Sequence, residues 1–205
     1  MTLNKEAIEA LLFEEEGTTI DFKSEQYKFE NEDDRTKSEL LKDILAFANA
    51  WRRSDAYILI GVKKVPGKQG EVLGVSLHVD DAKLQQFVNT KTQRPVSFSY
   101  KAVKCQGKDI AIIHIPKQER PIYLDKDFGK LEKNTVYIRR GSATDIATLD
   151  EVSKMRIDDA SSNLSNPRLD ISFYDNNRDC LIGQILNIGV PREGYCFLTG
   201  ARPDM

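Results

Sequence analysis

The stretch that decides the fold covers residues 36–62 and reads TKSELLKDILAFANAWRRSDAYILIGV. Thr36 and Glu39 have the spacing of a capping box, which predicts the start of a helix. The apolar residues that follow recur on one side at helical spacing, at Leu40, Leu41, Ile44, Leu45 and Ala48. Residues 56–62 are almost continuously apolar, which is typical of a strand covered on both faces. A helix that leads into a central strand indicates an α/β fold, onto which the other elements can pack.

Further helices and strands are predicted on both sides of this stretch. Helix patterns occur at residues 4–13, from Asp80 or Asp81 onward, and from Thr148 through Met155. Strand patterns occur at residues 18–23, 72–75 and 136–142, and in a hairpin over residues 96–115. These short elements predict a mixed β-sheet with packed helices, an α/β fold of the α+β type.

The chain of 205 residues divides into three predicted parts. Residues 1–157 form the main domain, and residues 158–168 have the composition of a linker. Residues 169–205 form a β-rich tail or the start of a truncated second domain. A segment of about 40 residues is too short to form a stable core alone. We therefore expect the tail to pair with the main sheet, with a second copy or a protein partner, or to begin a larger domain.

Composition indicates an ordinary soluble protein of a reducing compartment, here the cytoplasm. No apolar run approaches the roughly 18 residues that a membrane-spanning helix needs, and no secretory signal is visible. The three cysteines are widely spread and show no CxxC spacing, which favours free thiols. Residues 1–34 carry a net charge of −8 and the remaining residues one of +6. The basic body permits a polyanionic partner, and an ordinary solvated surface explains it equally well.

Three blocks of residues resemble the Schlafen-type AlbA-like domain, a family described as a DNA-binding domain of bacterial regulators. The blocks are residues 16–23 (EGTTIDFK), residues 44–50 with 58–62 (ILAFANA and ILIGV), and residues 136–144 (VYIRRGSAT). They follow one another in the family's order across about residues 5–155. The resemblance implies an AlbA/Schlafen-like core and a nucleic-acid-binding protein with a regulatory or defence role.

Glu16 and Asp21 are the candidate catalytic and metal-binding residues. Two carboxylates near one strand end can share a divalent cation that activates water, and the matching positions bind metal in the nuclease branch of the family. Lys23 lies two residues beyond Asp21, so both should face the same side and the lysine could contact a phosphate. Nuclease members of the family resemble one another in a third acid just after the central strand, where this chain has Lys63 and Lys64. Lys64 in place of that acid would weaken metal binding. The alternative is that Asp21 and Lys23 are surface strand residues and that Glu16 caps a helix end.

Basic side chains are the candidates for nucleic-acid contacts, with the Ser142 hydroxyl as a further donor. They are Lys23, Arg52, Arg53, Lys63, Lys64, Arg139 and Arg140. The pairs at 52–53 and 63–64 flank the central strand, so we expect them at its opposite ends. Neighbours on a strand alternate faces, so only one residue of the pair 139–140 should reach a given partner. Solvated surface charge explains each pair as well. Trp51 could stack on a base or pack on the core.

We therefore expect a bacterial protein that binds DNA or RNA through phosphate contacts and requires no cofactor. One alternative is a nuclease of the Schlafen type that uses Glu16 and Asp21 with Mg²⁺ or Mn²⁺. Another is an interaction module that binds a partner, or a second copy of itself, through residues 169–205. The sequence contains no phosphate-binding glycine loop and no Ser/His/Asp or Cys/His arrangement, so it gives other chemistries little support.

Overall fold

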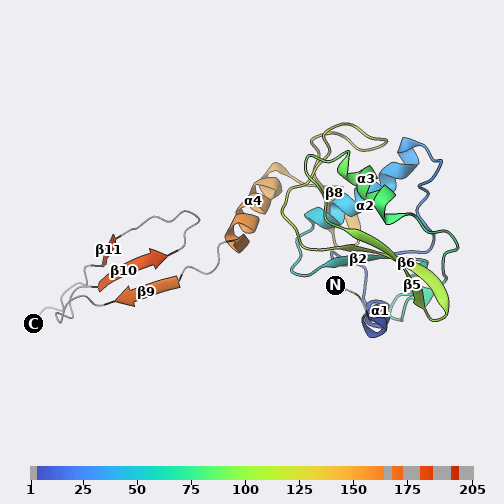
Figure 1. The fold of residues 1–205 in the computed structure, drawn as a ribbon, viewed down its shortest axis with the longest axis horizontal. Helices are drawn as coiled ribbons and strands as arrows, with labels where there is room; N and C mark the ends of the chain where they lie inside the picture. The colour runs from blue at the N-terminus through green and yellow to red at the C-terminus, as the bar shows by residue number, and fades with distance from the viewer. Residues whose placement is uncertain (1–3, 164–167, 173–180, 187–194, 199–205) are drawn as a thin grey trace, which may run out of the picture. The chain divides into compact units, whose positions relative to one another are not determined.

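The computed structural model describes residues 4–163, 168–172, 181–186 and 195–198, which form a mixed α+β fold (Figure 1). The helices are α1 (Lys5–Leu11), α2 (Asp34–Asn49), α3 (Asp81–Asn89) and α4 (Leu149–Asn163). The strands of the first unit are β1 (Ile20–Lys23), β2 (Ala56–Ile60), β3 (Val62–Lys63), β4 (Glu71–Val72), β5 (Ser99–Cys105), β6 (Lys108–Ile115), β7 (Tyr137–Arg140) and β8 (Ala143–Ile146). The chain divides into two compact units, Met1–Met155 and Arg156–Met205.

A four-stranded sheet in the order β1-β2-β6-β5 forms the centre of the first unit. β1 and β2 are parallel, and the other neighbours are antiparallel. Helices α2 and α3 cover one face of this sheet and α1 lies against the other (Figure 1). Asp21 pairs with Ile58 and Lys23 with Ile60, so these two charged residues project onto the face that α2 covers.

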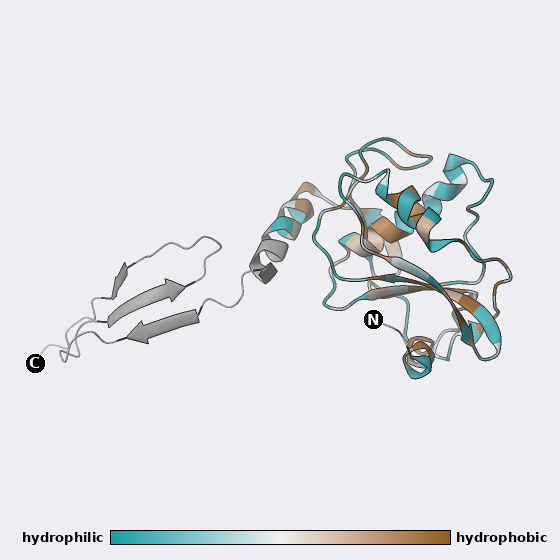
Figure 2. Cartoon of the chain, in the orientation of Figure 1, coloured by the Kyte–Doolittle hydropathy of each residue, from teal (hydrophilic) through white to brown (hydrophobic). Residues whose placement is uncertain are grey.

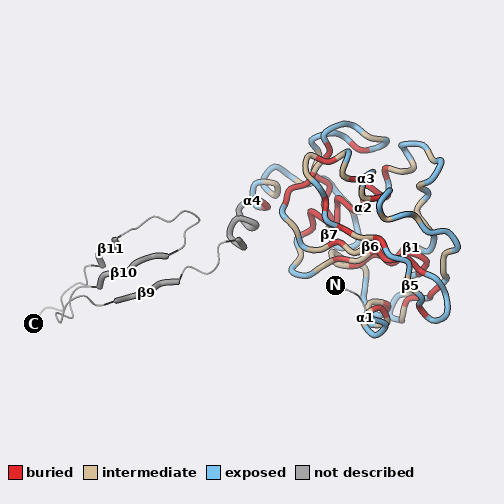
Figure 3. Tube along the Cα trace, in the orientation of Figure 1, coloured by how far each residue is buried: buried red, intermediate tan, exposed pale blue. Residues whose placement is uncertain are grey.

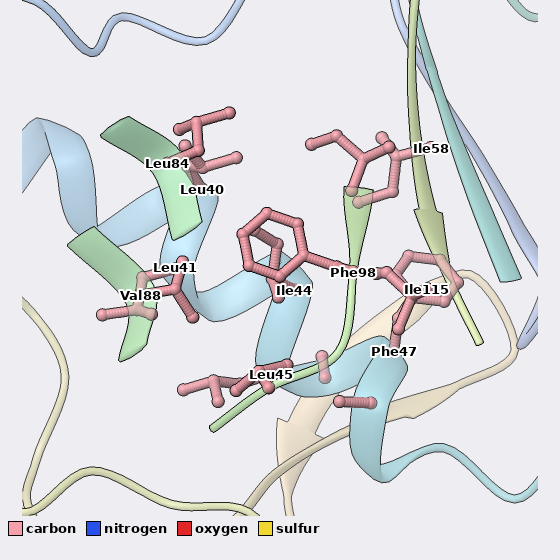
Figure 4. Close-up of a cluster of buried hydrophobic side chains, with 14 of the residues drawn as sticks. Leu40, Leu41, Ile44, Leu45, Phe47, Ile58, Leu84, Val88, Phe98 and Ile115 are labelled. Atoms are coloured by element: carbon pink, nitrogen blue, oxygen red, sulfur yellow. The ribbon is translucent and has the colours of Figure 1, made fainter. Parts of the chain in front are cut away.

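The apolar stripe of α2 forms the larger core, as the sequence predicts. Leu40, Leu41, Ile44 and Leu45 are buried against β2, β6 and α3, together with Phe47 (Figure 4). Each such side chain contributes about 1.5–3 kcal/mol by leaving water. Hydrophilic residues occupy the surrounding loops, which are largely exposed (Figures 2 and 3).

The start of α2 differs from the predicted capping box. The helix begins at Asp34, and the carboxylate of Asp33 accepts a hydrogen bond from the Thr36 N–H at 2.7 Å. Thr36 therefore lies within the first turn and Glu39 pairs with Lys130. Aspartate is at least as good an N-cap as threonine, so the earlier residue starts the helix.

The second face of the sheet carries a smaller core. Ile8 and Leu12 from the α1 segment pack with Phe22, Leu59 and Ile112. β2 is thus covered on both faces, which confirms the interpretation of its apolar run. The predicted caps Asn4 and Asp80 also start α1 and α3.

Asn49, at the end of α2, holds two distant segments together. Its side-chain amide donates to the carbonyl oxygens of Ile122 at 2.8 Å and Tyr137 at 2.9 Å. Its side-chain oxygen accepts from the Ile122 N–H at 2.8 Å. Asn49 is completely buried, so these bonds fix β7 beside α2.

β7 continues into a hairpin that the sequence analysis did not predict. Arg139 pairs with Thr144 in β8, and the turn lies at Gly141. The predicted capping box opens α4, since the Thr148 N–H donates to Glu151 at 2.7 Å. The helix continues to Asn163 and so includes the first residues of the segment predicted as a linker.

The second unit contains β9 (Arg168–Ser172), β10 (Leu181–Leu186) and β11 (Tyr195–Leu198). They form an antiparallel sheet in the order β11-β10-β9. The rest of the predicted tail over 169–205 lies outside the described residues. In the described part of the chain no helix is long and apolar enough to cross a membrane.

Candidate nucleic-acid interface

A buried ion pair joins β1 to β7 next to α2. Arg139 Nη2 lies 2.6 Å from Asp21 Oδ1, and the two side chains are only 5% and 6% exposed. Arg139 Nε also donates to the carbonyl oxygen of Gly17 at 3.2 Å, and its guanidinium carbon lies 4.8 Å from the centre of the Phe47 ring. The charge of Arg139 is therefore neutralised inside the domain.

Lys23 connects this pair to α2. Its Nζ lies 3.0 Å from Asp21 Oδ2 and 3.0 Å from Asp43 Oδ2. Asp43 Oδ2 also accepts a hydrogen bond from the Tyr27 hydroxyl at 2.7 Å. Burial opposes the charge on Lys23, but the neighbouring Asp43 and Asp21 outweigh it and raise the pKa of the lysine. Lys23 is one third exposed, so a permanent cation lies at the edge of the cluster.

Glu16 belongs to the free edge of β1. Its Oε1 accepts a hydrogen bond from the Phe22 N–H at 3.3 Å, and the Gly17 N–H donates to the Ile20 carbonyl oxygen at 3.0 Å. Both bonds satisfy backbone groups on the side of β1 that has no neighbouring strand. Glu16 thus covers the edge of the sheet, whereas Asp21 faces α2.

The acids do not fit a divalent metal. The carboxylate of Asp21 is paired with the cations Arg139 and Lys23, and a metal ion would have to displace or tolerate both. In the part of the chain that the structure describes, no group of three or more His, Cys, Asp or Glu side chains is placed to hold a metal. We therefore derive no metal-dependent step from this cluster.

An open cleft of about 620 Å³ lies beside the cluster. Its lining residues are mostly charged: Lys23, Glu25, Gln26, Tyr27, Lys28, Glu32, Thr36, Glu39, Lys42 and Asp43. Asp43 is paired with Lys23, and Glu39 with Lys130 at 2.8 Å. No ion pair involves Lys28 or Lys42 within the described residues, so these two ammonium groups are available to a ligand.

The arginine pair before β2 divides into one internal and one external residue. Arg52 Nε donates to the Phe47 carbonyl oxygen at 3.1 Å and its Nη2 to that of Pro116 at 2.8 Å. Burial lowers the pKa of Arg52. The hydrogen bonds of its side chain join the end of α2 to the segment after β6. Arg53 is exposed and makes no ion pair with any described residue.

The lysine pair after β2 lies at the opposite end of that strand, as expected. Lys64 Nζ lies 2.9 Å from Glu15 Oε1 and donates to the Glu14 carbonyl oxygen at 2.6 Å. Lys63 is exposed, and none of the described carboxylates pairs with it. Of this pair, Lys63 is the free cation.

Arg139 and Arg140 face opposite ways, which agrees with strand alternation. Arg140 is exposed and pairs with Asp145 in β8 and with Glu151 in α4. Hydrogen bonding to Glu151 raises the pKa of Arg140 further. Ser142 is exposed in the turn of the hairpin. The structure does not bring Arg140 and Ser142 together with Lys23.

Asp43, Tyr27, Lys28 and Lys42 were missed by the sequence analysis. Asp43 and Phe47 lie one turn apart on the same face of α2, which is the side that meets Arg139 and Lys23. A carboxylate beside an apolar stripe was therefore the available signal for Asp43. Lys28 belongs to an irregular polar segment that carries no periodic signal.

Comparison with known proteins gives a family and distant structural neighbours. No curated protein matches the chain. The DIP2311 protein of Corynebacterium diphtheriae is 18% identical, with a TM-score of 0.46 over 68% of this chain and 24% of that one. The N-terminal domain of a RecG-related protein of Nitrosomonas europaea is 20% identical, with a TM-score of 0.37 over 57% of this chain and 78% of that one. This chain thus spans about a quarter of the first of these structures.

The profile of the family described as Schlafen, AlbA_2 matches residues 16–148. This range contains β1, α2, the central sheet and the β7–β8 hairpin, and with them the buried pair of Asp21 and Arg139. The chain therefore belongs to the Schlafen AlbA_2 family.

Proposed function

We propose that this domain binds nucleic acid through contacts to phosphate groups and does not cleave it. The observation that carries the proposal is the open cleft beside β1, in which Lys28 and Lys42 have no carboxylate partner among the described residues. Membership of the Schlafen AlbA_2 family supports the same class of partner, because the resemblance implies nucleic-acid binding.

The three lysines of the cleft have different roles in this proposal. Lys23 is held in place by Asp21 and Asp43 and presents a fixed positive edge. Lys28 and Lys42 contact phosphate oxygens directly, since an ammonium group on a long flexible stem adapts to the backbone of a nucleic acid. Arg53 and Lys63, at the two ends of β2, extend the contacts outside the cleft.

Acidic residues in the same cleft limit the affinity. Glu25 and Glu32 have no cationic partner in the described part of the chain and oppose the charge of Lys28 and Lys42. We therefore expect moderate affinity with a strong dependence on salt, because phosphate contacts release counterions. A protein of this kind suits a regulatory or defence role in a bacterial cytoplasm.

Fluorescence anisotropy of labelled oligonucleotides tests the proposal. Full-length protein is titrated into single-stranded and double-stranded DNA and RNA at low and at physiological salt. We expect binding at micromolar protein that weakens as salt rises. The proposal is refuted if none of the four oligonucleotides shows salt-dependent binding.

A further inference from the structure

A second surface, away from the cleft, forms where residues 51–57 meet residues 114–120. Two hydrogen bonds join these two segments: Arg52 Nη2 donates to the Pro116 carbonyl oxygen at 2.8 Å, and Asp55 Oδ1 accepts from the Lys117 N–H at 3.2 Å. The surface lies at the beginning of β2 and the end of β6, whereas Lys23 of the cleft lies at the end of β1. We call it the aromatic end; it comprises Trp51, Arg53, Tyr57, His114 and Lys117, with the buried Arg120 against the Trp51 ring.

Two contacts between planar groups lie there, a buried arginine against an exposed tryptophan and a pair of stacked, partly exposed rings. The guanidinium carbon of Arg120 lies 4.5 Å from the centre of the Trp51 ring, and Trp51 is 38% exposed. The rings of Tyr57 and His114 are stacked with their centres 5.1 Å apart and their planes inclined by 21°. Tyr57 and His114 are each partly exposed. In each contact, the neighbouring group therefore fixes the orientation of the exposed ring.

The His114 ring is held by a carboxylate and is partly exposed. Its Nε2 lies 2.7 Å from Asp55 Oδ2, which sets the orientation of the ring. The residue opposite His114 in β5 is Ser99, whose side chain is small. On the β1 side of the Tyr57–His114 pair, Tyr57 lies opposite Ile20 in the strand register.

The charge at the aromatic end suits a phosphate backbone. Arg53 and Lys117 are exposed, and neither makes an ion pair with a described residue. Asp55 is bonded to His114, and Glu119 is paired with Arg94 at 3.0 Å. Arg53 and Lys117 are therefore available to a phosphate group in the same two segments that carry the exposed rings.

We infer that the aromatic end stacks the unpaired bases of single-stranded nucleic acid, with Trp51 and the Tyr57–His114 pair as platforms and Arg53 and Lys117 on the backbone. The inference rests on the proposed function and narrows its partner to single strands. Every base has a flat face that stacks on an aromatic ring, and base pairing in a duplex keeps that face inside the helix. The protein should therefore prefer single strands.

Trp51 is the sole tryptophan of the chain, so its fluorescence reports directly on this surface. The experiment titrates full-length protein with a thymidine oligonucleotide and with a duplex of the same length, and follows both tryptophan emission and oligonucleotide anisotropy. We expect the single strand to quench Trp51 as it binds, and the duplex to bind without quenching.

Substitution of Trp51 supplies the second readout. Trp51→Ala should weaken single-strand binding roughly 5- to 150-fold, the loss expected for one stacked base, and leave duplex binding unchanged. Trp51→Phe should restore most of the affinity, and Lys104→Ala, on the exposed side of β5, should have no effect. Since Trp51 is partly exposed, thermal unfolding of each variant checks that the fold is retained.

The outcomes separate the inference from the proposed function. Single strands that bind without quenching Trp51, and with equal affinity to Trp51→Ala, would overturn the inference and leave the proposed function standing. Absence of any binding in the anisotropy signal would overturn both. Equal quenching by the duplex would overturn the preference for single strands.

Discussion

Arg139 and Asp21 are separated by more than half of the chain and meet in a buried ion pair with 2.6 Å between Nη2 and Oδ1. The pair joins the β7–β8 hairpin to the edge strand β1, beside Phe47 of α2. Lys23 is the second cation paired with Asp21, and its partly exposed ammonium group lines the cleft. An interior pair of this kind orders the surface from which Lys23 projects.

Removing one member of the buried pair should destabilise the domain strongly. We expect Arg139→Ala to lower the free energy of unfolding by about 3–5 kcal/mol, because a buried carboxylate loses its closest partner. Urea denaturation measures the change. Arg140→Ala is the matched control. Arg140 is the exposed neighbour of Arg139 and pairs with acids in contact with water, so its loss should change the free energy of unfolding far less. Equal losses in the two variants would contradict the account.

Gly129 is predicted to be indispensable for packing the loop against α2. A Cβ atom at Gly129 would lie 2.2 Å from the Asp34 carbonyl oxygen, and the residue has a φ of +58°. Gly141 has a nearly identical φ of +56° but open space around it. Gly141→Ala should therefore cost only backbone strain of about 1–2 kcal/mol, and Gly129→Ala clearly more. Similar melting temperatures for the two variants would refute this explanation.

Stability should fall in the alkaline range because of Tyr27. Burial and then Asp43 raise the pKa of Tyr27 well above its ordinary value. The unfolded chain releases this proton near pH 10 and the folded one only at higher pH. The stabilising contribution is thus complete below pH 10 and is lost as the pH rises toward the folded pKa, at up to about 1.4 kcal/mol per pH unit.

Tyr27→Phe isolates this effect, since it removes the titrating hydroxyl and keeps the ring. We expect the variant to be less stable at neutral pH, where it lacks the hydrogen bond to Asp43, and to lose stability less steeply above pH 10. Urea denaturation between pH 8 and pH 11 gives both slopes. Parallel curves would show that Tyr27 does not titrate as described.

Divalent metal should not convert the protein into a nuclease. Because Arg139 and Lys23 occupy the Asp21 carboxylate, we expect oligonucleotides incubated with the protein and Mn²⁺ or Mg²⁺ to remain intact on a gel. Shortened products that disappear in Asp21→Asn would show that these cations release Asp21, and that the nuclease alternative holds. Asp21→Asn also requires a stability check, since it alters the buried pair.

Local patterns predicted most of the elements that surround the site. The stripe from Leu40 to Ala48 gave the helix and its buried face because helical spacing alone places those residues together. The cap of α2 was placed three residues too late, because the Thr36–Glu39 spacing fits a capping box while Asp33 takes the capping role. The Asp33 cap and the Thr36–Glu39 capping box are both local patterns, and they compete for the start of the helix within one turn.

The charge network could not be predicted from the sequence in the same way. Asp21 and Lys23 share a face of β1 by strand alternation, and this part was expected. Their partners Arg139 and Asp43 come from other elements, and only the packing of β7 beside α2 brings them near. Which lysines stay free depends on that packing as well. Arg52 and Arg53 look alike in the sequence, yet one binds backbone carbonyls and the other faces water.

The salt dependence of binding by a cleft variant tests the central claim most directly. The double substitution Lys28→Ala and Lys42→Ala should weaken binding and reduce the slope of log affinity against log salt by about 2, one for each lost phosphate contact. The control is Lys68→Ala with Lys104→Ala, which removes two exposed lysines outside the cleft. A reduced slope in the cleft variant alone would support phosphate binding in the cleft. An unchanged slope in the cleft variant would contradict it.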